Sequence, residues 1–348
     1  MLSAEKKDAR SVFSFWLMKN NIIHFETLGC RLNQDETEGA ARSFSDAGFI
    51  CEFNSISSAK NPSQDVILSV INTCTVTGKA EQKARRIIRL LLEKFFNAPL
   101  IVTGCYAELA DSEITSISKN RIVIVPGTKK FVLKEFAVAM NGGDLDFKSG
   151  KFNFENLKSF VSKKIFSFER IDSAKKIPMA INPFALYTPV FEKHSRATLK
   201  IQDGCDNRCT YCIIWKARGK SRSADSDFIV EQINNFSKHG FKEVMLTGIH
   251  IGQWGKEFGL TLLDLLKEIE KRTTIERYRL GSLNPTEITD ELLDFLSKSD
   301  KFCPHFHLSL QSANDKTLRS MNRFYKTEDY LAQIDKINDI FELPFLGS

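Results

Sequence analysis

Residues 197–212 read Ala-Thr-Leu-Lys-Ile-Gln-Asp-Gly-Cys-Asp-Asn-Arg-Cys-Thr-Tyr-Cys, a short apolar strand followed at once by three cysteines. Cys205, Cys209 and Cys212 have C-x3-C-x2-C spacing within one tight loop. Three thiolates placed in this way can hold three irons of a [4Fe–4S] cluster and leave the fourth iron without a protein ligand. An exogenous chelator can occupy that vacancy, as happens at the open position of a catalytic metal site. We therefore interpret these three cysteines as the catalytic centre.

Other chemistries fit the triplet less well. A structural zinc ion needs a fourth ligand, which Cys303 or His305 could supply only if the fold brought one of them close. A ferredoxin-type electron carrier uses C-x2-C-x2-C, which is a different spacing.

The chain around the triplet alternates strands and helices from residue 196 to residue 348. Short apolar runs predict four strands, and helix-period apolar residues lie between and after them. Four βα units and the start of a fifth strand at 341–345 cannot close a barrel. We predict an incomplete, TIM-like βα barrel. The expected strands are 197–202, 243–247, 278–282 and 305–309, and the expected helices are 227–238, 260–272, 286–297, 315–321 and 328–337.

A second α/β domain is predicted over residues 21–140. Its strands alternate with helices, which is typical of a doubly wound parallel sheet covered on both faces. The expected strands are 22–27, 66–72, 100–103 and 121–125, and the expected helices are 35–47, 79–96 and 106–118.

Three more cysteines, Cys30, Cys74 and Cys105, follow the ends of the first three of these strands. Ligands of open α/β sheets bind at that edge, so three loops can converge there on one metal centre. Cys51 and Cys303 have no such placement, and we interpret both as structural.

The distribution of basic residues suggests a polyanionic partner. Residues 129–178 carry 11 Lys and Arg against 6 Asp and Glu, and two further basic clusters occur. Basic clusters suit a polyanion such as RNA, although each alone is also compatible with a solvated surface. We interpret 141–195 as an extended basic linker and 1–20 as a dispensable N-terminal extension. The two further clusters are Lys79, Lys83, Arg85, Arg86 and Arg89, and Lys216, Arg218, Lys220 and Arg222.

The cysteine content and the lack of long apolar runs predict a cytoplasmic protein. Eight cysteines without a secretion signal indicate a reducing compartment, and no apolar run approaches the roughly 18 residues that span a bilayer. We expect no membrane partner.

Several longer motifs resemble the radical S-adenosylmethionine (radical SAM) superfamily and, within it, the methylthiotransferases. The resemblance covers about residues 22–345. In that superfamily the methionyl amine and carboxylate bind the open iron, and reductive cleavage of the sulfonium yields a 5′-deoxyadenosyl radical. The motifs are GCDNRCTYCIIWKARGKSRS (204–223), LTGIHIGQWG (246–255), LGSLNPTEITDELL (280–293) and CPHFHLSLQSANDKTLRSMNR (303–323).

The resemblance implies two [4Fe–4S] clusters, with S-adenosylmethionine as the other cofactor. Methylthiotransferases hold a second cluster on three separated cysteines, which match Cys30, Cys74 and Cys105, and they are thought to present sulfur on it. The cofactor-binding candidates are Thr247, Gly248 and His250, which resemble the family's glycine-containing segment, and Ser282 and Gln311, which are expected to contact the ribose or carboxylate or to cap a helix.

The resemblance also indicates the substrate. TLGCRLNQDETEG (27–39) and the pattern CTYCII–ARGKSRS are most similar to the threonylcarbamoyladenosine-tRNA branch. The implied reaction adds a methylthio group to C2 of N6-threonylcarbamoyladenosine at position 37 of tRNA, with a reductant such as flavodoxin or ferredoxin. The chain departs from the family at Trp215-Lys216, where Pro-Tyr is usual. Trp215 could stack on a base or pack against the protein.

The end of the chain leaves the functional prediction open. Family members continue through a fifth strand with a glycine-rich turn, a sixth strand and a small RNA-binding β-domain, so the chain resembles a C-terminally truncated member. The alternatives are a catalytically inactive iron–sulfur or RNA-binding remnant, and a methylthiotransferase of a ribosomal protein.

Overall fold

The computed structural model describes residues 21–53, 55–56, 58, 63, 65–142, 154–172, 183–189 and 196–347. The expected N-terminal extension (1–20) and part of the expected linker lie outside these residues. The chain forms two compact units, divided between Tyr187 and Thr188.

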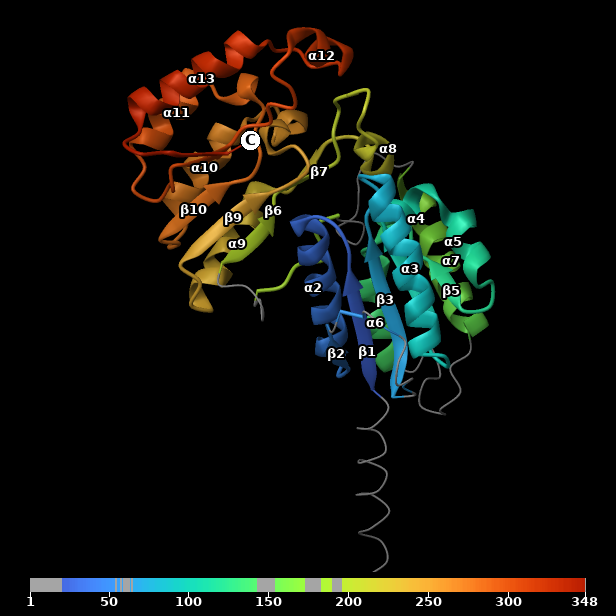
Figure 1. The fold of residues 1–348 in the computed structure, drawn as a ribbon. Coiled ribbons are helices and arrows are strands. Elements are labelled where there is room, and N and C mark those ends of the chain that lie inside the picture. The colour runs from blue at the N-terminus through green and yellow to red at the C-terminus, as the bar shows by residue number, and fades with distance from the viewer. Residues whose placement is uncertain are drawn as a thin grey trace, which may run out of the picture. The chain divides into compact units, whose positions relative to one another are not determined.

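The N-terminal unit contains a five-stranded sheet in the order β2-β1-β3-β4-β5, and every neighbouring pair is parallel (Figure 1). The short strand β2, which contains Cys51, was not expected from the sequence. The strands are β1 (Ile22–Thr27), β2 (Ile50–Glu52), β3 (Val66–Thr73), β4 (Leu100–Gly104) and β5 (Ile122–Ile124).

Helices cover both faces of this sheet. One apolar core joins it to α2 (Arg31–Asp46), α6 (Val132–Gly142) and α7 (Phe154–Asp172). A second core joins it to α3 (Gly78–Lys94) and to α4 (Cys105–Leu109) and α5 (Asp111–Ile117), where one longer helix was expected. The predicted doubly wound parallel sheet is therefore confirmed.

Helix α3 shows how the sequence produces one of these layers. The Thr77 side chain accepts a hydrogen bond from the Ala80 amide and so caps the first turn. Ala84, Ile88 and Leu91 recur at helical spacing and are fully or almost fully buried against the sheet.

The predicted extended linker over 141–195 is wrong for residues 154–172, which form helix α7. Leu157 and Val161 are four residues apart, so they lie on one face of the helix, and both are buried in the core beside α2 and α6. The lysines of this segment occupy the remaining faces, which is why its composition resembled that of a linker.

The C-terminal unit is built from successive parallel strands and helices. Strands β10 (Arg277–Leu280), β9 (Glu243–Thr247) and β6 (Ala197–Lys200) form one parallel sheet. Strand β11 (His305–His307) pairs in parallel with β12 (Phe345–Gly347), and single bridges join the β10 and β11 segments. The predicted strand at 341–345 therefore lies later, at β12.

The remaining elements surround these strands (Figure 1). The short antiparallel strands β7 (Gln202–Asp203) and β8 (Arg222–Ser223) flank the cysteine triplet. The helices are α8 (Ile214–Arg218), α9 (Ser226–Lys238), α10 (Leu262–Arg272), α11 (Asp290–Ser297), α12 (Asp315–Ser320) and α13 (Thr327–Ile340), with single 3-10 turns at Ile251–Gln253, Lys256–Phe258 and Pro285–Glu287. This is the expected partial βα barrel.

Within the described residues, no helix combines the length and the apolar composition that crossing a membrane requires.

The role of α7 can be tested by truncating a residue of its buried face. Leu157→Ala is expected to destabilise the N-terminal unit by about 2–5 kcal/mol, because the cavity lies in the main core. The exposed control Lys158→Ala is expected to change stability by at most about 0.5 kcal/mol. Urea titration followed by amide hydrogen exchange of β1 and β3 measures both, and equal effects would contradict the packing of α7.

Candidate functional site

The first set of predicted cysteines lies at the carboxyl edge of the N-terminal sheet. Strands β1, β3 and β4 are neighbours, and their register pairs Thr27 with Asn72 and Asn72 with Thr103. The three strands therefore end at the same level. Cys30, Cys74 and Cys105 follow these ends, the first exposed and the other two buried.

Two glycines let the three cysteine loops touch. Gly29 has φ of 101°, and a Cβ there would lie 2.5 Å from the Cβ of Cys74 and 2.8 Å from its sulfur. Gly104 has the same φ, and its Cβ would lie 2.2 Å from the carbonyl oxygen of Thr73. Only glycine permits this backbone conformation and this approach together. The residues next to Cys30 and Cys105 therefore contact the loop that carries Cys74.

Buried amides connect the same loops. The Asn33 side chain donates hydrogen bonds to the carbonyl oxygens of Leu28 (2.9 Å) and Thr73 (3.1 Å). The Asn72 side chain in turn donates to the Asn33 carbonyl oxygen at 2.9 Å. Neither Asn33 nor Asn72 was predicted from the sequence to have a role at this site. Their positions, three residues after Cys30 and two before Cys74, were the available signal.

A buried ion pair lies beneath this edge. Lys130 contacts the carboxylate of Glu36 and, at 3.5 Å, the side-chain oxygen of Asn33. Lys130 and Glu36 are both almost fully buried, and a buried charge requires a partner of this kind. The pair fixes the first turns of α2, which begins directly after Cys30.

The second set, Cys205, Cys209 and Cys212, lies in the loop between β7 and α8. Gly204 has φ of 74°, and a Cβ there would lie 2.0 Å from the carbonyl oxygen of Lys220. The Cys205 amide donates to Gly219 (3.1 Å), and the Cys212 amide donates to Cys209 (3.1 Å). The loop therefore folds back on the residues that follow it.

A buried charge cluster supports this loop from below. Asp203 accepts hydrogen bonds from Lys200 (3.0 Å) and Arg218 (3.1 Å), and all three side chains are buried. Arg218 was expected to contribute to a basic, RNA-facing cluster. The structure corrects this, because its guanidinium neutralises Asp203 in the interior. Within that cluster, Lys216 and Lys220 are exposed.

The thiols of this loop influence one another. Burial raises the pKa of the Cys209 thiol, Arg323 lowers it, and the neighbouring Cys212 and Cys205 raise it again. Within the described part of the chain, no three His, Cys, Asp or Glu side chains converge as they would around a single metal ion. Cluster ligands bind separate irons and need not converge in that way. The chemistry of three thiols in one loop, with Cys205 and Cys212 both close enough to influence Cys209, is that of a [4Fe–4S] donor set.

His250 links the cysteine loop to the segment that follows strand β10. Its Nδ1 lies 3.5 Å from the Cys205 sulfur, and its Nε2 contacts the carboxylate of Glu287 and, at 2.6 Å, the side-chain nitrogen of Asn284. Burial opposes the charged form, but the hydrogen bonds to Cys205 and Glu287 raise the pKa of His250 to about 9.

Asn284 extends this network to a cation. Arg323 donates from one nitrogen to the Asn284 side-chain oxygen (2.8 Å) and from the other to the Tyr211 hydroxyl (3.0 Å). Tyr211 lies between Cys209 and Cys212 in the sequence. Asn284, Glu287 and Arg323 were not among the residues predicted from the sequence, although all three lie in the quoted motifs.

The predicted cofactor-binding residues fall into two groups. Thr247 ends β9, and a Cβ on Gly248 would lie 2.8 Å from the Gln202 carbonyl oxygen, while the His250 amide donates to the Gln202 side chain at 2.7 Å. The segment Thr247–His250 is thus held beside the strand that leads into the cysteine loop.

The other two candidates follow later strands. The Ser282 hydroxyl contacts Nδ1 of His307 at 2.8 Å. Gln311 is exposed and has φ of 64°, so it turns the chain in the left-handed region. Thr247–His250 therefore contact the surroundings of Cys205, whereas Ser282 contacts His307.

Trp215 is partly exposed beside the loop. The guanidinium of Arg208 lies over its ring, 4.2 Å from the centroid, and the Lys216 ammonium lies 5.2 Å from it. The ring therefore contacts two cations of its own chain.

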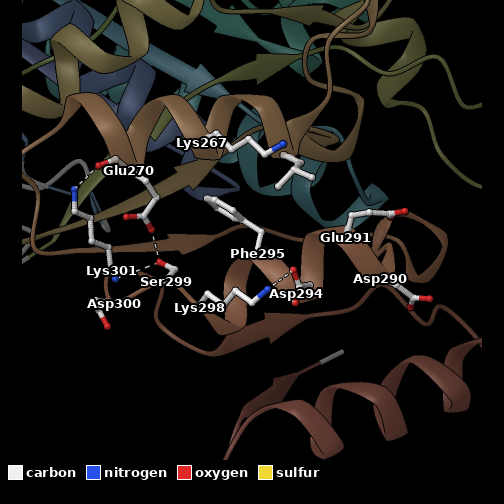
Figure 2. A pocket seen from close by; sticks show the side chains of 11 residues that line it. Lys267, Glu270, Asp290, Glu291, Asp294, Phe295, Lys298, Ser299, Asp300 and Lys301 are labelled. Atoms are coloured by element: carbon white, nitrogen blue, oxygen red, sulfur yellow. Dashed lines mark hydrogen bonds and ion pairs between the residues drawn. The ribbon is translucent and has the colours of Figure 1, made fainter.

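A hollow of about 810 Å³ opens between α10 and α11, on the outer helical layer. Figure 2 shows Phe295 between Lys267 and Lys298, with Lys298 paired to Asp294. Its lining mixes both signs of charge and contains no cysteine. The residues are Leu263, Lys267, Glu270, Asp290, Glu291, Asp294, Phe295, Lys298, Ser299, Asp300 and Lys301.

The fold and the cysteine loop define a radical SAM protein. The model of the radical SAM superfamily matches residues 199–343, and the model of the uncharacterized protein family UPF0004 matches residues 22–125. Superfamily membership implies one [4Fe–4S] cluster and S-adenosylmethionine as cofactors.

Curated relatives specify the family. The threonylcarbamoyladenosine tRNA methylthiotransferase MtaB of Treponema pallidum (strain Nichols) is 34% identical over 93% of this chain and 73% of its own length. The proteins of the same name from Thermotoga maritima (30% identical) and Bacillus subtilis strain 168 (32%) match 91% and 90% of the chain. The chain belongs to the methylthiotransferase family of radical SAM enzymes, as the sequence motifs predicted.

Two further facts qualify the match. The chain spans 64% and 63% of the length of the Thermotoga and Bacillus relatives. A tRNA-2-methylthio-N(6)-dimethylallyladenosine synthase of Syntrophus aciditrophicus (strain SB) is 29% identical over 96% of the chain and 67% of its own length.

Solved structures support the fold. The radical S-adenosylmethionine methyltransferase TsrM from Kitasatospora setae gives a TM-score of 0.56 at 14% identity, covering 94% of this chain and 69% of that one. The cobalamin-dependent radical enzyme OxsB gives 0.54 at 11% identity, covering 95% and 49%. Both likenesses concern the architecture alone.

The His250–Glu287 contact predicts a pH-dependent stability. His250 has a higher pKa in the folded state than the usual value of about 6.5, so its contribution is complete below about pH 6.5 and is lost as the pH rises through about 9. In iron-free protein, Glu287→Gln should lower the unfolding free energy at pH 6 and flatten its fall between pH 6.5 and 9.

Denaturant titrations at several pH values measure this effect. The control Glu268→Gln removes an exposed pairing partner of Arg272 and should leave the pH profile unchanged. A Glu287→Gln profile that matches the wild type would contradict the charged His250–Glu287 pair.

Proposed function

We propose that this chain carries out methylthiolation of tRNA at C2 of N6-threonylcarbamoyladenosine at position 37. The observation that carries the proposal is the presence of two separate sets of three cysteines, each beside the carboxyl ends of parallel strands. The names of the T. pallidum, T. maritima and B. subtilis relatives support the same substrate.

Cys205, Cys209 and Cys212 would hold the cluster of the radical reaction. Three thiolates leave one iron free, and the bound cluster supplies the electron for reductive cleavage of S-adenosylmethionine. The contact between His250 and the Cys205 sulfur at 3.5 Å supports an orienting role for this histidine.

The same loop is bordered by groups suited to the cofactor. The backbone at Thr247 and Gly248 offers a close approach for the methionyl amine, since Gly248 lacks a side chain. Ser282 and Gln311 are proposed to contact the ribose or carboxylate, and their polar side chains lie after strands β10 and β11, on the side where barrels carry their chemistry.

Cys30, Cys74 and Cys105 would hold a second [4Fe–4S] cluster that presents sulfur. The approach of Gly29 to Cys74 and the hydrogen bonds of Asn33 join the first two loops, and the approach of Gly104 to Thr73 adds the loop of Cys105, which supports this assignment. Cys30 is exposed, whereas the other two are buried, so this cluster would reach solvent on the side of Cys30.

The RNA partner is supported by the exposed basic face of α3. Four basic side chains are exposed along this helix: Lys79, Lys83, Arg86 and Arg89. Binding of RNA phosphates to such side chains releases the counterions condensed on the RNA, which favours association. The Syntrophus relative is named for a dimethylallyladenosine product, so that modified base is the competing substrate. A reductant such as flavodoxin or ferredoxin and a cytoplasmic location complete the proposal.

Iron content tests the two clusters. After anaerobic reconstitution we expect roughly eight irons per chain. Replacing Cys205, Cys209 and Cys212 by Ala together should leave about four, and so should replacing Cys30, Cys74 and Cys105. Each remaining set keeps its own strand-end scaffold. Cys51→Ala and Cys303→Ala are matched controls that should retain all eight.

Function follows from two assays on the same variants. Cofactor cleavage should be lost when Cys205, Cys209 and Cys212 are replaced and retained when Cys30, Cys74 and Cys105 are replaced. Mass spectrometry of tRNA nucleosides should detect the methylthio product with the wild type and the two controls but with neither triple variant. Loss of cleavage in both would contradict the division of roles. A methylthio product that forms on tRNA carrying dimethylallyladenosine, and not on tRNA carrying threonylcarbamoyladenosine, would show that dimethylallyladenosine is the substrate.

A further inference from the structure

A turn at residues 320–323 forms hydrogen bonds with the cysteine loop of the C-terminal unit. The Thr210 amide donates to the Met321 carbonyl oxygen (3.2 Å), and the Thr210 hydroxyl donates to Ser320 (2.9 Å). In the opposite direction, the Asn322 side chain donates to the Arg208 carbonyl oxygen at 3.1 Å. We call the segment Ser320–Arg323 the clasp.

The shape of the clasp is set by the end of α12. The Asn322 amide donates to Arg319 (3.0 Å), and the Arg323 amide donates to Leu318 (2.9 Å). This is the Schellman pattern of a helix C-terminus, which places one residue in the left-handed region. That residue is Asn322, with φ of 58°. Asparagine tolerates the conformation and, unlike glycine, provides an amide that reaches the loop.

The clasp is itself anchored, so it can restrain the loop. Arg323 bridges Asn284, at the end of the third barrel strand, and Tyr211, inside the cysteine loop. Leu318 is buried, and the Tyr325 hydroxyl donates to the carbonyl oxygens of Ser309 and Leu310. The turn is therefore held on both of its sides.

The loop needs such support, because little regular structure constrains it. Residues 204–213 contain no helix or strand, and their backbone must present three thiols at fixed positions. Ordering a flexible loop at the moment of binding costs conformational entropy, and a loop held in advance avoids most of that cost.

We propose that Asn322 and Arg323 are positioning residues that hold the Cys205–Cys212 loop in its ligand-presenting shape before any cluster is bound. This inference rests on the proposed cluster site. It adds that the capacity of the loop to take up and retain iron depends on hydrogen bonds from a turn about 110 residues away.

The test uses the full chain and two variants that loosen the clasp from opposite sides. Asn322→Gly keeps the left-handed turn but removes the amide, and Thr210→Val keeps the branched shape but removes the hydroxyl. Leu343→Gly is the control, because Leu343 also has positive φ (51°) and is 91% exposed.

Two readouts are compared. Amide hydrogen exchange of residues 205–212 in iron-free protein should be about 2- to 10-fold faster in both variants, the effect of losing one hydrogen bond. Iron release from reconstituted protein to a chelator should accelerate by a similar factor, and the electron paramagnetic resonance signal of the reduced cluster should broaden. Thermal unfolding midpoints of the variants should match that of Leu343→Gly.

Unchanged exchange in both Asn322→Gly and Thr210→Val would overturn the inference, as would equal acceleration in Leu343→Gly. A wild-type chain that takes up no iron would contradict the proposed cluster site instead. The exchange measurements would then still decide whether the clasp orders the loop.

Discussion

The alignment of neighbouring parallel strands is the constraint on which the N-terminal site depends. Because β1, β3 and β4 pair in register up to Thr27, Asn72 and Thr103, residues that follow them meet at one edge without long loops. The three cysteines are far apart in the sequence, but the loops that carry them are therefore adjacent in the fold. Glycine at positions 29 and 104 then removes the atoms that would keep those loops apart.

The C-terminal unit solves the same geometrical problem locally. One loop provides all three thiols, so strand register cannot position them, and the surroundings must do so. Asp203, paired with Lys200 and Arg218, supports the start of the loop, His250 contacts its first cysteine, and the clasp holds Arg208 and Thr210. The first site is fixed by sheet topology and the second by side-chain hydrogen bonds.

Much of this arrangement could be predicted from the sequence, and the exceptions have physical causes. Alternating apolar runs give β3 and α3 closely, because long periodic segments carry strong signals. Helix α7 was missed because abundant lysine and serine conceal two buried residues, Leu157 and Val161, spaced one turn apart. The burial of Arg218 depends on Asp203, fifteen residues away, and only the folded chain reveals that pairing.

The cysteines themselves were visible as a pattern, but the network around them was not. Asn33 and Asn72 join loops 39 residues apart, and Arg323 joins two segments to which it has no sequence proximity. Long-range hydrogen bonds leave no periodic signal in a single sequence. The motifs that contain these polar residues could therefore be recognised in the sequence, whereas the role of each residue became clear only from the three-dimensional structure.

The most direct test of the account is whether S-adenosylmethionine interacts with one cysteine set alone. We would record electron paramagnetic resonance spectra of reduced, reconstituted protein in which either set is replaced by alanine, with and without the cofactor. The account predicts that the cofactor shifts the spectrum when Cys205, Cys209 and Cys212 remain and leaves it unchanged when only Cys30, Cys74 and Cys105 remain. A shift confined to the second protein, or in neither, would contradict it.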